Sequence, residues 1–312
     1  MRHNLYIPII LSLLFLQVKI AQAQSPVDLS RFNKKGGVKV LAKTQYLKLQ
    51  WPAGDGKTAQ LELDLKAGSP LFQSIGIGTA TNIKPVAKAI DPAFVLTVST
   101  RDLVSQNGWN IFFDRVNKKP RKSYAVTLKK NKASVRSDGS RTYIRIGETS
   151  AGPFSGDLEI TLYNGTPLFN VAAVMHTKLD SAAILYDAAL TAKNPAFKTF
   201  AWSDTQEKLQ QNKPAASDSI HHLPTKYRTI IGENAGGSLA MFPAPHQYFY
   251  PLDEAFNLKF NWYGSDYQKL IPGFGMGIRQ DPNGDNRFVP WFNAPPGTQQ
   301  RLNFFCLIGG GD

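Results

Sequence analysis

Apolar and polar residues alternate in several short segments of this chain, and this pattern constrains the fold more than any other feature. The clearest segments are 61–65, 109–113 and 158–162, in which every second residue is Leu, Ile, Trp or Phe. Side chains of a β-strand point alternately to opposite faces, so a period of two predicts strands that bury one face. A sheet built from such strands needs a second layer to cover its apolar face.

Turn signals predict that neighbouring strands pair in antiparallel fashion. Asp138-Gly139 and Asn164-Gly165 each separate two alternating segments, and both dipeptides tolerate the positive φ angles of tight hairpins. From about 38 to 192 no long helical period separates the strands, which argues against a parallel α/β sheet. We therefore predict a mainly all-β fold, a large antiparallel β-sandwich over residues 24–312, with 193–232 as the place where it could divide.

One short helix is predicted within a long surface connection. Residues 193–228 are polar and contain proline. Ser203 followed by Gln206 has the spacing of a capping box, which predicts a helix over 204–213. This helix would carry little apolar surface beyond Leu209, so the connection should lie on the surface between two groups of strands.

The first 23 residues have the pattern of a secretory signal peptide. Arg2 precedes an apolar stretch over 5–18, and Ala21-Gln22-Ala23 supplies the small residues that a signal peptidase reads. The alternative is a membrane anchor, but the stretch is shorter than the roughly 20 residues that span a bilayer, and Lys19 follows it. We expect cleavage before Gln24, export to the periplasm or beyond, and no transmembrane anchor in the mature bacterial protein.

Composition places the chain among globular proteins with a substantial core. Its 312 residues are 42% hydrophobic, 11% aromatic and 19% charged, which excludes disordered, coiled-coil and collagen-like chains. The single cysteine, Cys306, has no disulfide partner and lies in the apolar run 304–308. We expect it to be a buried hydrophobic side chain and not a catalytic thiol.

The charge balance points to an anionic partner. The formal net charge is +13, and removal of a leader that contains Arg2 and Lys19 leaves +11. Such a surface attracts an acidic polysaccharide or an anionic cell envelope, and export makes nucleic acid the poorest partner. The densest basic cluster, 118–132, is interpreted as a solvated hairpin face that lysines protect from edge pairing.

Motifs that would assign the chain to a familiar enzyme class do not occur in the sequence. It has no Gly-rich phosphate loop, no His-Glu-x-x-His, no paired Cys-x-x-Cys and no Gly-x-Ser-x-Gly. His221 and His222 are adjacent, so on a strand they would point to opposite faces and could not share an ion. We interpret both as solvated loop residues.

A proline-punctuated aromatic segment, 242–253, supplies the first candidate site. Its prolines hold the backbone extended, which would present His246, Gln247 and Tyr248 with little loss of entropy. Aromatic faces and polar tips of this kind suit sugar recognition. Gln247 and Tyr248 are candidate ligand-binding residues, and the candidate catalytic residues are His246, Tyr250 and Asp253. The alternative is a structural loop that packs its aromatic side chains inward.

A second candidate site is a cation loop. Asp281, Asn283 and Asp285 place oxygen-bearing side chains at alternate positions, a spacing that can wrap Ca²⁺. An EF-hand would need Glu at the position that Phe292 occupies. The alternative is a plain β-turn, since Asp-Pro-Asn-Gly suits one without any metal.

A second rigid aromatic segment follows at 287–298, and it carries a resemblance. The ligand-binding candidates here are Arg279, Arg287, Trp291 and Asn293. The strings 243–251 (PAPHQYFYP) and 287–298 (RFVPWFNAPPGT) resemble segments of large exported bacterial proteins that are uncharacterised, and that resemblance implies a further, hydrolytic domain after residue 312. More loosely, the hairpins over 141–178 are similar to the galactose-mutarotase-like β-sandwiches of polysaccharide lyases and glycosidases, a similarity of fold and not of function.

Two functions from different classes follow from these features. The first is an exported glycan-recognition or accessory region of a carbohydrate-processing protein that binds a polysaccharide or oligosaccharide, acidic ones included. The alternative is a complete glycosidase or polysaccharide lyase that uses carboxylates such as Asp187, Asp253 or Glu148. The apolar run 302–308, followed by three glycines, also suggests an unpartnered edge strand before a missing domain.

Overall fold

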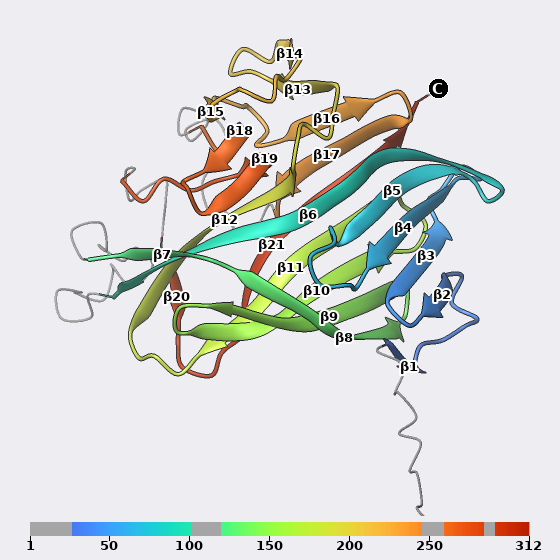
Figure 1. The fold of residues 1–312 in the computed structure, drawn as a ribbon, viewed down its shortest axis with the longest axis horizontal. Coiled ribbons are helices and arrows are strands. Elements are labelled where there is room, and N and C mark those ends of the chain that lie inside the picture. Colours follow the sequence, from blue (N-terminus) through green and yellow to red (C-terminus); the bar gives the residue numbers. More distant parts are fainter. Residues whose placement is uncertain (1–26, 102–119, 245–258, 284–290, 312) are drawn as a thin grey trace, which may run out of the picture.

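Two large β-sheets pack face to face in the computed structural model (Figure 1), which describes residues 27–101, 120–244, 259–283 and 291–311. Strands account for every regular element in these four ranges. The prediction of a mainly antiparallel β-sandwich is confirmed. The strand expected over 109–113 lies outside the described residues.

The first sheet has ten strands, and all of its pairings are antiparallel except that of β1 with β8. In spatial order the strands are β1 (Val27–Arg31), β8 (Thr127–Asp138), β9 (Arg141–Ala151), β10 (Phe154–Tyr163), β11 (Leu168–Thr177), β21 (Gln300–Gly310), β17 (Gly237–Pro243), β16 (Ile230–Asn234), β13 (Thr199–Ser203) and β14 (Leu209–Asn212).

The second sheet has eleven strands and lies in front of the first in Figure 1. In spatial order its main path is β15 (His221–Leu223), β18 (Asn261–Tyr267), β19 (Ile271–Ile278), β12 (Ala182–Ala192), β6 (Asn82–Thr100), β5 (Phe72–Thr79), β4 (Thr58–Asp64), β3 (Tyr46–Pro52) and β2 (Lys39–Lys43). Two short strands attach beside this path, β20 (Phe292–Ala294) to β12 and β7 (Lys122–Ala125) to β6.

The main core fills the space between the two sheets, as the alternating pattern predicts. In β10, Leu158, Ile160 and Leu162 are buried in this core, so the residues between them face outward. From the second sheet, Trp51 contacts Phe169 of the first with ring centroids 6.5 Å apart. Each large apolar side chain that is fully buried in this way stabilises the fold by about 1.5–3 kcal/mol.

Both predicted hairpins are present. Asp138 pairs with Arg141 across the turn between β8 and β9, and Gly139 has a φ of 57°. The turn between β10 and β11 contains Gly165, whose φ is 88°. Glycine adopts these left-handed conformations without the steric cost that a Cβ would bring.

The short helix predicted over 204–213 is wrong. Asp204 Oδ1 accepts hydrogen bonds from the backbone N–H groups of Gln206 and Lys208, at 2.8 and 2.9 Å, and holds a turn that leads into β14. Leu209 is 66% exposed, so the segment has no apolar face to bury. A ten-residue helix without tertiary packing is marginal in water, whereas pairing with β13 satisfies the backbone.

The predicted edge strand at 302–308 is also wrong. This segment lies within β21, in the middle of the first sheet, where β11 pairs with one side and β17 with the other. Cys306 stands opposite Phe169 and Met241 and is fully buried, as expected for a structural thiol. Because β21 is paired on both sides, it offers no open edge through which the protein could self-associate.

The long connection is divided between the two sheets. Residues 193–228 contribute β13 and β14 to the first sheet and β15 to the second. His221 and His222 are exposed, but they belong to the edge strand β15 and not to a loop. The division of the sandwich near 193–232 stays a prediction. The described ranges include no helix that is long and apolar enough to cross a membrane.

Candidate functional site

Half of the residues that the sequence analysis selected as site candidates lie outside the described residues. These are His246, Gln247, Tyr248, Tyr250, Asp253, Asp285 and Arg287. The described candidates are Arg279, Asp281, Asn283, Trp291 and Asn293, together with the carboxylates Asp187 and Glu148.

Arg279 and Asp281 form a partly buried ion pair. Arg279 is 8% exposed, and its Nη2 lies 3.2 Å from Asp281 Oδ2, while its Nη1 donates to the backbone oxygen of Lys259 at 3.1 Å. Burial opposes ionisation of Asp281, but the N–H of Asn283 and the Arg279 guanidinium outweigh it and lower its pKa. Trp291 is only 4% exposed and packs inward, whereas Asn293 is exposed on β20.

The candidate calcium loop begins with a turn. Asn283 N–H donates to Asp281 Oδ1 at 2.9 Å, and the Asn283 side-chain oxygen accepts from Arg121. Within the described residues, no group of three His, Cys, Asp or Glu side chains is placed to hold a metal. Calcium binding by Asp281, Asn283 and Asp285 stays a prediction, which a rise of the melting temperature in millimolar Ca²⁺, reversed by chelator, would support.

The candidate carboxylates Asp187 and Glu148 lie on different sheets. Asp187 is 3% exposed on β12, where it accepts hydrogen bonds from Gln280 N–H, Gln268 Nε2 and Tyr267 Oη. Glu148 is exposed on β9 beside Lys132. They therefore do not form the pair across one cleft that glycoside hydrolysis requires.

A polar cavity of about 430 Å³ opens on the outer face of the first sheet. We call it the sheet cavity. It is lined by charged, aromatic and neutral polar side chains of β8, β9, β10, β11 and β21, together with Gln299: Arg136, Arg141, Tyr143, Arg145, Glu159, Thr161, Tyr163, Asn170, Arg301, Asn303 and Phe305. None of these residues was selected from the sequence.

Strand register places six side chains of this face in one line. Each member stands directly opposite the next on the neighbouring strand, so the line runs across the strands for about 24 Å, given a spacing of roughly 4.8 Å between strands. We call it the cross-strand row, and it consists of Arg136, Tyr143, Thr161, Asn170, Phe305 and Phe242.

The floor of the sheet cavity is polar and buried. Thr161, Asn170 and Asn303 are at most 6% exposed although they point away from the main core. Asn170 Nδ2 donates to Asn303 Oδ1 at 3.0 Å and to the backbone oxygen of Phe304 at 2.9 Å. Because these hydrogen bonds fix the amide, its orientation is set before any ligand arrives.

Glu159 organises two arginines of the cavity. Its side chain is 5% exposed, Oε1 accepts from Arg301 Nη2 at 2.9 Å, and Oε2 lies 3.6 Å from Arg145 Nη2. The charge-assisted hydrogen bond holds the Arg301 guanidinium in a defined position, and the ion pair keeps Arg145 beside the same carboxylate. Arg145 also lies 3.8 Å from the carboxylate of Asp157.

The two other arginines lie over tyrosine rings. The Arg136 guanidinium is 3.9 Å from the ring centroid of Tyr143, and that of Arg141 is 5.6 Å from the ring centroid of Tyr163. Burial raises the pKa of Tyr163, so its hydroxyl stays protonated and can donate hydrogen bonds at neutral pH. These stacks present flat cationic and aromatic surfaces to solvent.

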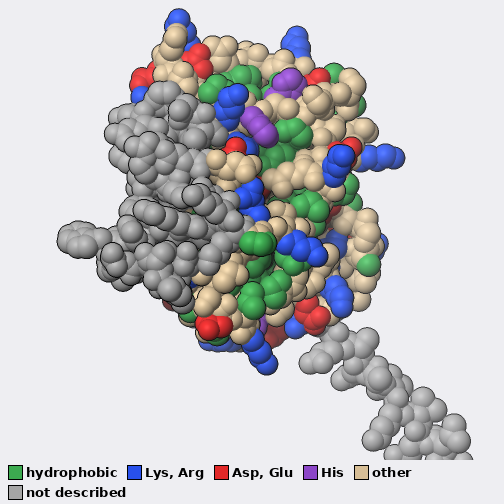
Figure 2. Space-filling view, turned by 90° about the vertical axis from the view of Figure 1, so that its left-hand side faces the viewer, with side chains coloured by type: hydrophobic (Ala, Val, Ile, Leu, Met, Phe, Trp, Pro, Cys, Tyr) green, Lys and Arg blue, Asp and Glu red, His purple; other side chains and the backbone are tan. Residues whose placement is uncertain are grey.

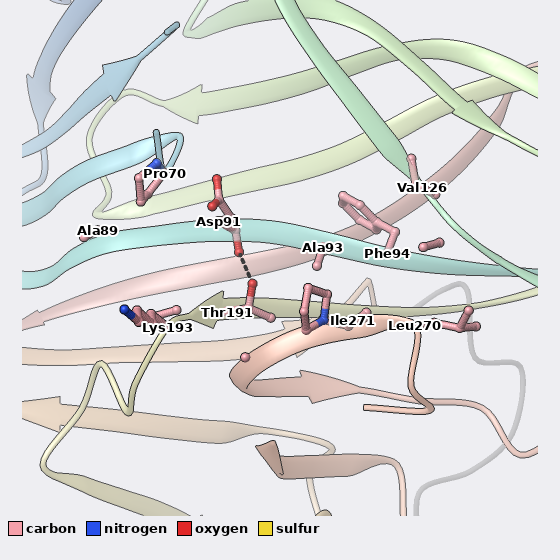
Figure 3. Close-up of a pocket in the computed structure, with 14 residues that line it drawn as sticks. Pro70, Ala89, Asp91, Ala93, Phe94, Val126, Thr191, Lys193, Leu270 and Ile271 are labelled. Atoms are coloured by element: carbon pink, nitrogen blue, oxygen red, sulfur yellow. Dashed lines mark hydrogen bonds between the residues drawn. The ribbon is translucent and has the colours of Figure 1, made fainter. Parts of the chain in front are cut away.

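A second cavity, of about 490 Å³, lies on the second sheet and has a different character (Figure 3). Its lining is mainly apolar, with Asp91, Thr191 and Lys193 as the prominent polar residues. Asp91 Oδ1 accepts from the backbone N–H of Leu71 at 2.6 Å, so this carboxylate supports the chain itself. The sheet cavity brings more convergent polar groups together, and these are what orient a ligand.

Positive charge is spread over the described part of the face that Figure 2 shows. Figure 2, which shows the end of the molecule that lies at the left of Figure 1, has Lys and Arg side chains distributed over its described part. They do not gather there into one patch. The sheet cavity, in contrast, brings four arginines together in its lining.

Comparison with known proteins assigns no family. No protein-family model and no curated protein matches the chain. Among solved structures, the chain is similar to a galactose mutarotase related enzyme from Lactobacillus acidophilus, with 9% identity over 84% of this chain and 97% of that one and a TM-score of 0.40.

Two larger proteins contain a similar region. A GH36 alpha-galactosidase from Geobacillus stearothermophilus is 9% identical over 89% of this chain and 41% of its own length, with a TM-score of 0.40. A protein in the Glycosyl Hydrolase Family 38 from Enterococcus faecalis is 8% identical over 87% of this chain, with a TM-score of 0.35. This chain spans 31% of the length of the family 38 protein. Similarities this distant do not assign a function.

Proposed function

We propose that this protein is an exported carbohydrate-binding β-sandwich and that it holds an oligosaccharide or polysaccharide chain along the cross-strand row of its first sheet. The observation that carries the proposal is the row itself. It joins aromatic rings at one end, a buried polar floor in the middle and an arginine stacked on a tyrosine at the other end.

Each part of the row suits one property of a sugar. Phe305 and Phe242 stack at 5.9 Å with their rings 14° apart, and both are partly exposed, so they offer a flat apolar surface to the face of a pyranose ring. Asn170 and Thr161 supply polar groups for hydroxyls beside it. The floor lies on strands and not on loops, which keeps these groups in place before a ligand binds.

The chemistry of the sheet cavity favours binding over cleavage. Glycosidases use two carboxyl groups across one cleft, and Glu159 is the sole carboxylate among the described residues that line this cavity. Arg145 and Arg301 already neutralise it. A lyase would need a base, and burial keeps the Tyr163 phenol protonated by raising its pKa.

Calorimetric titration with a panel of neutral and acidic polysaccharides tests the proposal. We expect at least one to bind the wild-type protein, and we expect Tyr143→Ala and Phe305→Ala to weaken that binding by about tenfold or more, since stacked aromatic side chains dominate such contacts. Tyr227→Ala is the matched control, because Tyr227 is a 51% exposed tyrosine that does not line the cavity.

Two results would contradict the proposal. The first is an absence of binding across the panel. The second is binding that Tyr227→Ala weakens as much as Phe305→Ala does, when circular dichroism shows both variants to be folded. Release of reducing ends by the wild-type protein would favour the enzymatic alternative.

A further inference from the structure

We infer that the sheet cavity selects glycans that carry an anionic group, a uronate carboxylate or a sulfate ester, and that Arg141 binds this group. The inference rests on the proposed function, since it assigns a class of ligand to the same cavity. It also gives the bound chain a direction, with its acidic sugar at the end of the cavity formed by β8 and β9.

The balance of charge in the sheet cavity supports an anionic ligand. Four guanidinium groups line it and one carboxylate, Glu159, opposes them. Two further carboxylates lie at its margin, with Asp138 3.6 Å from Arg136 and Asp157 3.8 Å from Arg145. The pair between Arg136 and Asp138 is exposed, so solvent screens it, and a ligand can compete for the arginine.

Arg141 differs from the other three arginines of the cavity. Arg136, Arg145 and Arg301 each lie within ion-pair distance of a carboxylate. No carboxylate of the described residues lies within 4.0 Å of a nitrogen of Arg141. Its guanidinium lies over the Tyr163 ring, which positions the group without neutralising its charge.

The position of Arg141 suits the recognition of an acid group beside a sugar ring. Arg141 stands directly opposite Tyr163 on β10, and Tyr163 contacts Phe305 with ring centroids 6.1 Å apart. A sugar stacked on the aromatic side chains would therefore bring a substituent toward the guanidinium. The planar fork of arginine matches the two oxygens of a carboxylate or sulfate.

A pair of matched polymers tests the inference. Polygalacturonate and its carboxyl-reduced form share one backbone and differ in carrying a carboxylate or a hydroxymethyl group, and dextran sulfate and dextran differ in carrying a sulfate ester or a hydroxyl. We expect wild-type protein to bind at least one anionic polymer about tenfold or more tightly than its neutral counterpart. We expect Arg141→Gln to remove most of this preference, so that the anionic polymer binds little more tightly than its neutral counterpart.

Two further variants separate a specific contact from general attraction. Lys88→Gln removes the same charge from an exposed residue of β6 outside the sheet cavity, and should leave the preference intact. Arg141→Lys keeps the charge but loses the planar fork, so it should retain only part of the preference.

Three outcomes would overturn the inference. Equal affinity of the wild-type protein for anionic and neutral polymers refutes it and leaves the proposed function standing. Equal losses in Arg141→Gln and Lys88→Gln would show attraction by net charge alone. Binding of no polymer at all would refute the proposed function and this inference together. A preference within the polygalacturonate pair identifies the bound group as a carboxylate, and a preference within the dextran pair identifies it as a sulfate.

Discussion

Asp187 Oδ1 accepts a hydrogen bond of 2.7 Å from the backbone N–H of Gln280, and this contact joins the middle of β12 to the chain that leaves β19. Gln268 Nε2 and Tyr267 Oη donate to the other oxygen, at 2.7 and 3.2 Å. The carboxylate thus connects three segments around a small apolar cluster on the outer face of the second sheet, which contains Trp262 and Tyr267.

Stability should depend on pH through this carboxyl group. Burial raises the pKa of Asp187 from 3.8 to about 6, although the hydrogen bonds and the nearby Arg279 oppose the rise. Because the pKa is raised in the folded state, the Asp187 carboxyl group contributes stability to the folded protein below pH 4. This contribution is lost as the pH rises through about 6. For this group the loss amounts to about 3 kcal/mol.

The substitution Asp187→Asn isolates this effect from other titrating groups. The amide cannot ionise, so the stability of the variant relative to wild type should increase when the pH is raised from 4.5 to 7.5. Urea denaturation of both proteins at the two pH values measures the change. An identical difference in unfolding free energy at both values would show that Asp187 does not titrate in this range.

Gly277 should not tolerate a side chain. A Cβ at this position of β19 would lie 2.4 Å from the backbone oxygen of Ala188 and 2.6 Å from Trp262 Nε1. Gly277→Ala should therefore cost about 1–3 kcal/mol of unfolding free energy, because a strand must shift to make room. Gly310→Ala is the control, since a Cβ there meets only ordinary contacts at 3.7 Å. Equal stability of the two variants in thermal melts would contradict the prediction.

The thiol of Cys306 should be unreactive in the folded protein. It is buried in β21, and burial raises its pKa well above the usual range for a thiol. The thiolate is the reactive form, so an aromatic disulfide reagent should react with it only after denaturant is added. Rapid reaction without denaturant would show that β21 opens readily, contrary to its position between β11 and β17.

The sequence predicts the sandwich because its strands carry local signals. Alternation in 158–162 and the turns at Gly139 and Gly165 depend on neighbours along the chain, and the structure contains both hairpins. The mistakes arise where the outcome depends on distant partners. Residues 204–213 form a turn and a strand because β13 is available for pairing. The run 302–308 is central because β11 and β17 flank it.

The sheet cavity could not be predicted from the sequence in the same way. Its residues come from five strands, and register alone brings Asn170 next to Phe305, 135 positions away in the sequence. A local signal does exist in β9, where Arg141, Tyr143 and Arg145 alternate with residues of the core. Arginine and tyrosine on the outer face of a strand are compatible with a solvated surface, so only the assembled sheet distinguishes the two interpretations.

Removal of the internal counter-charge should weaken the fold and strengthen anion binding. Glu159→Gln keeps the size of the side chain but leaves Arg145 and Arg301 without their buried carboxylate. Loss of the charge-assisted hydrogen bond to Arg301 and of the ion pair with Arg145 should cost about 1.5–3 kcal/mol of unfolding free energy. Both guanidinium groups then lose the counter-charge of Glu159, so the affinity for an anionic polymer should rise several-fold, by about 1 kcal/mol, at low salt.

Glu148→Gln provides the control for this prediction. It makes the same change of charge at an exposed residue of β9 that does not line the sheet cavity. Its stability should stay within about 0.5 kcal/mol of wild type, and its affinity should not rise beyond the small effect of net charge. If Glu159→Gln bound the anionic polymer no more tightly than Glu148→Gln, Arg145 and Arg301 would be structural residues only, and anion recognition would rest on Arg136 and Arg141.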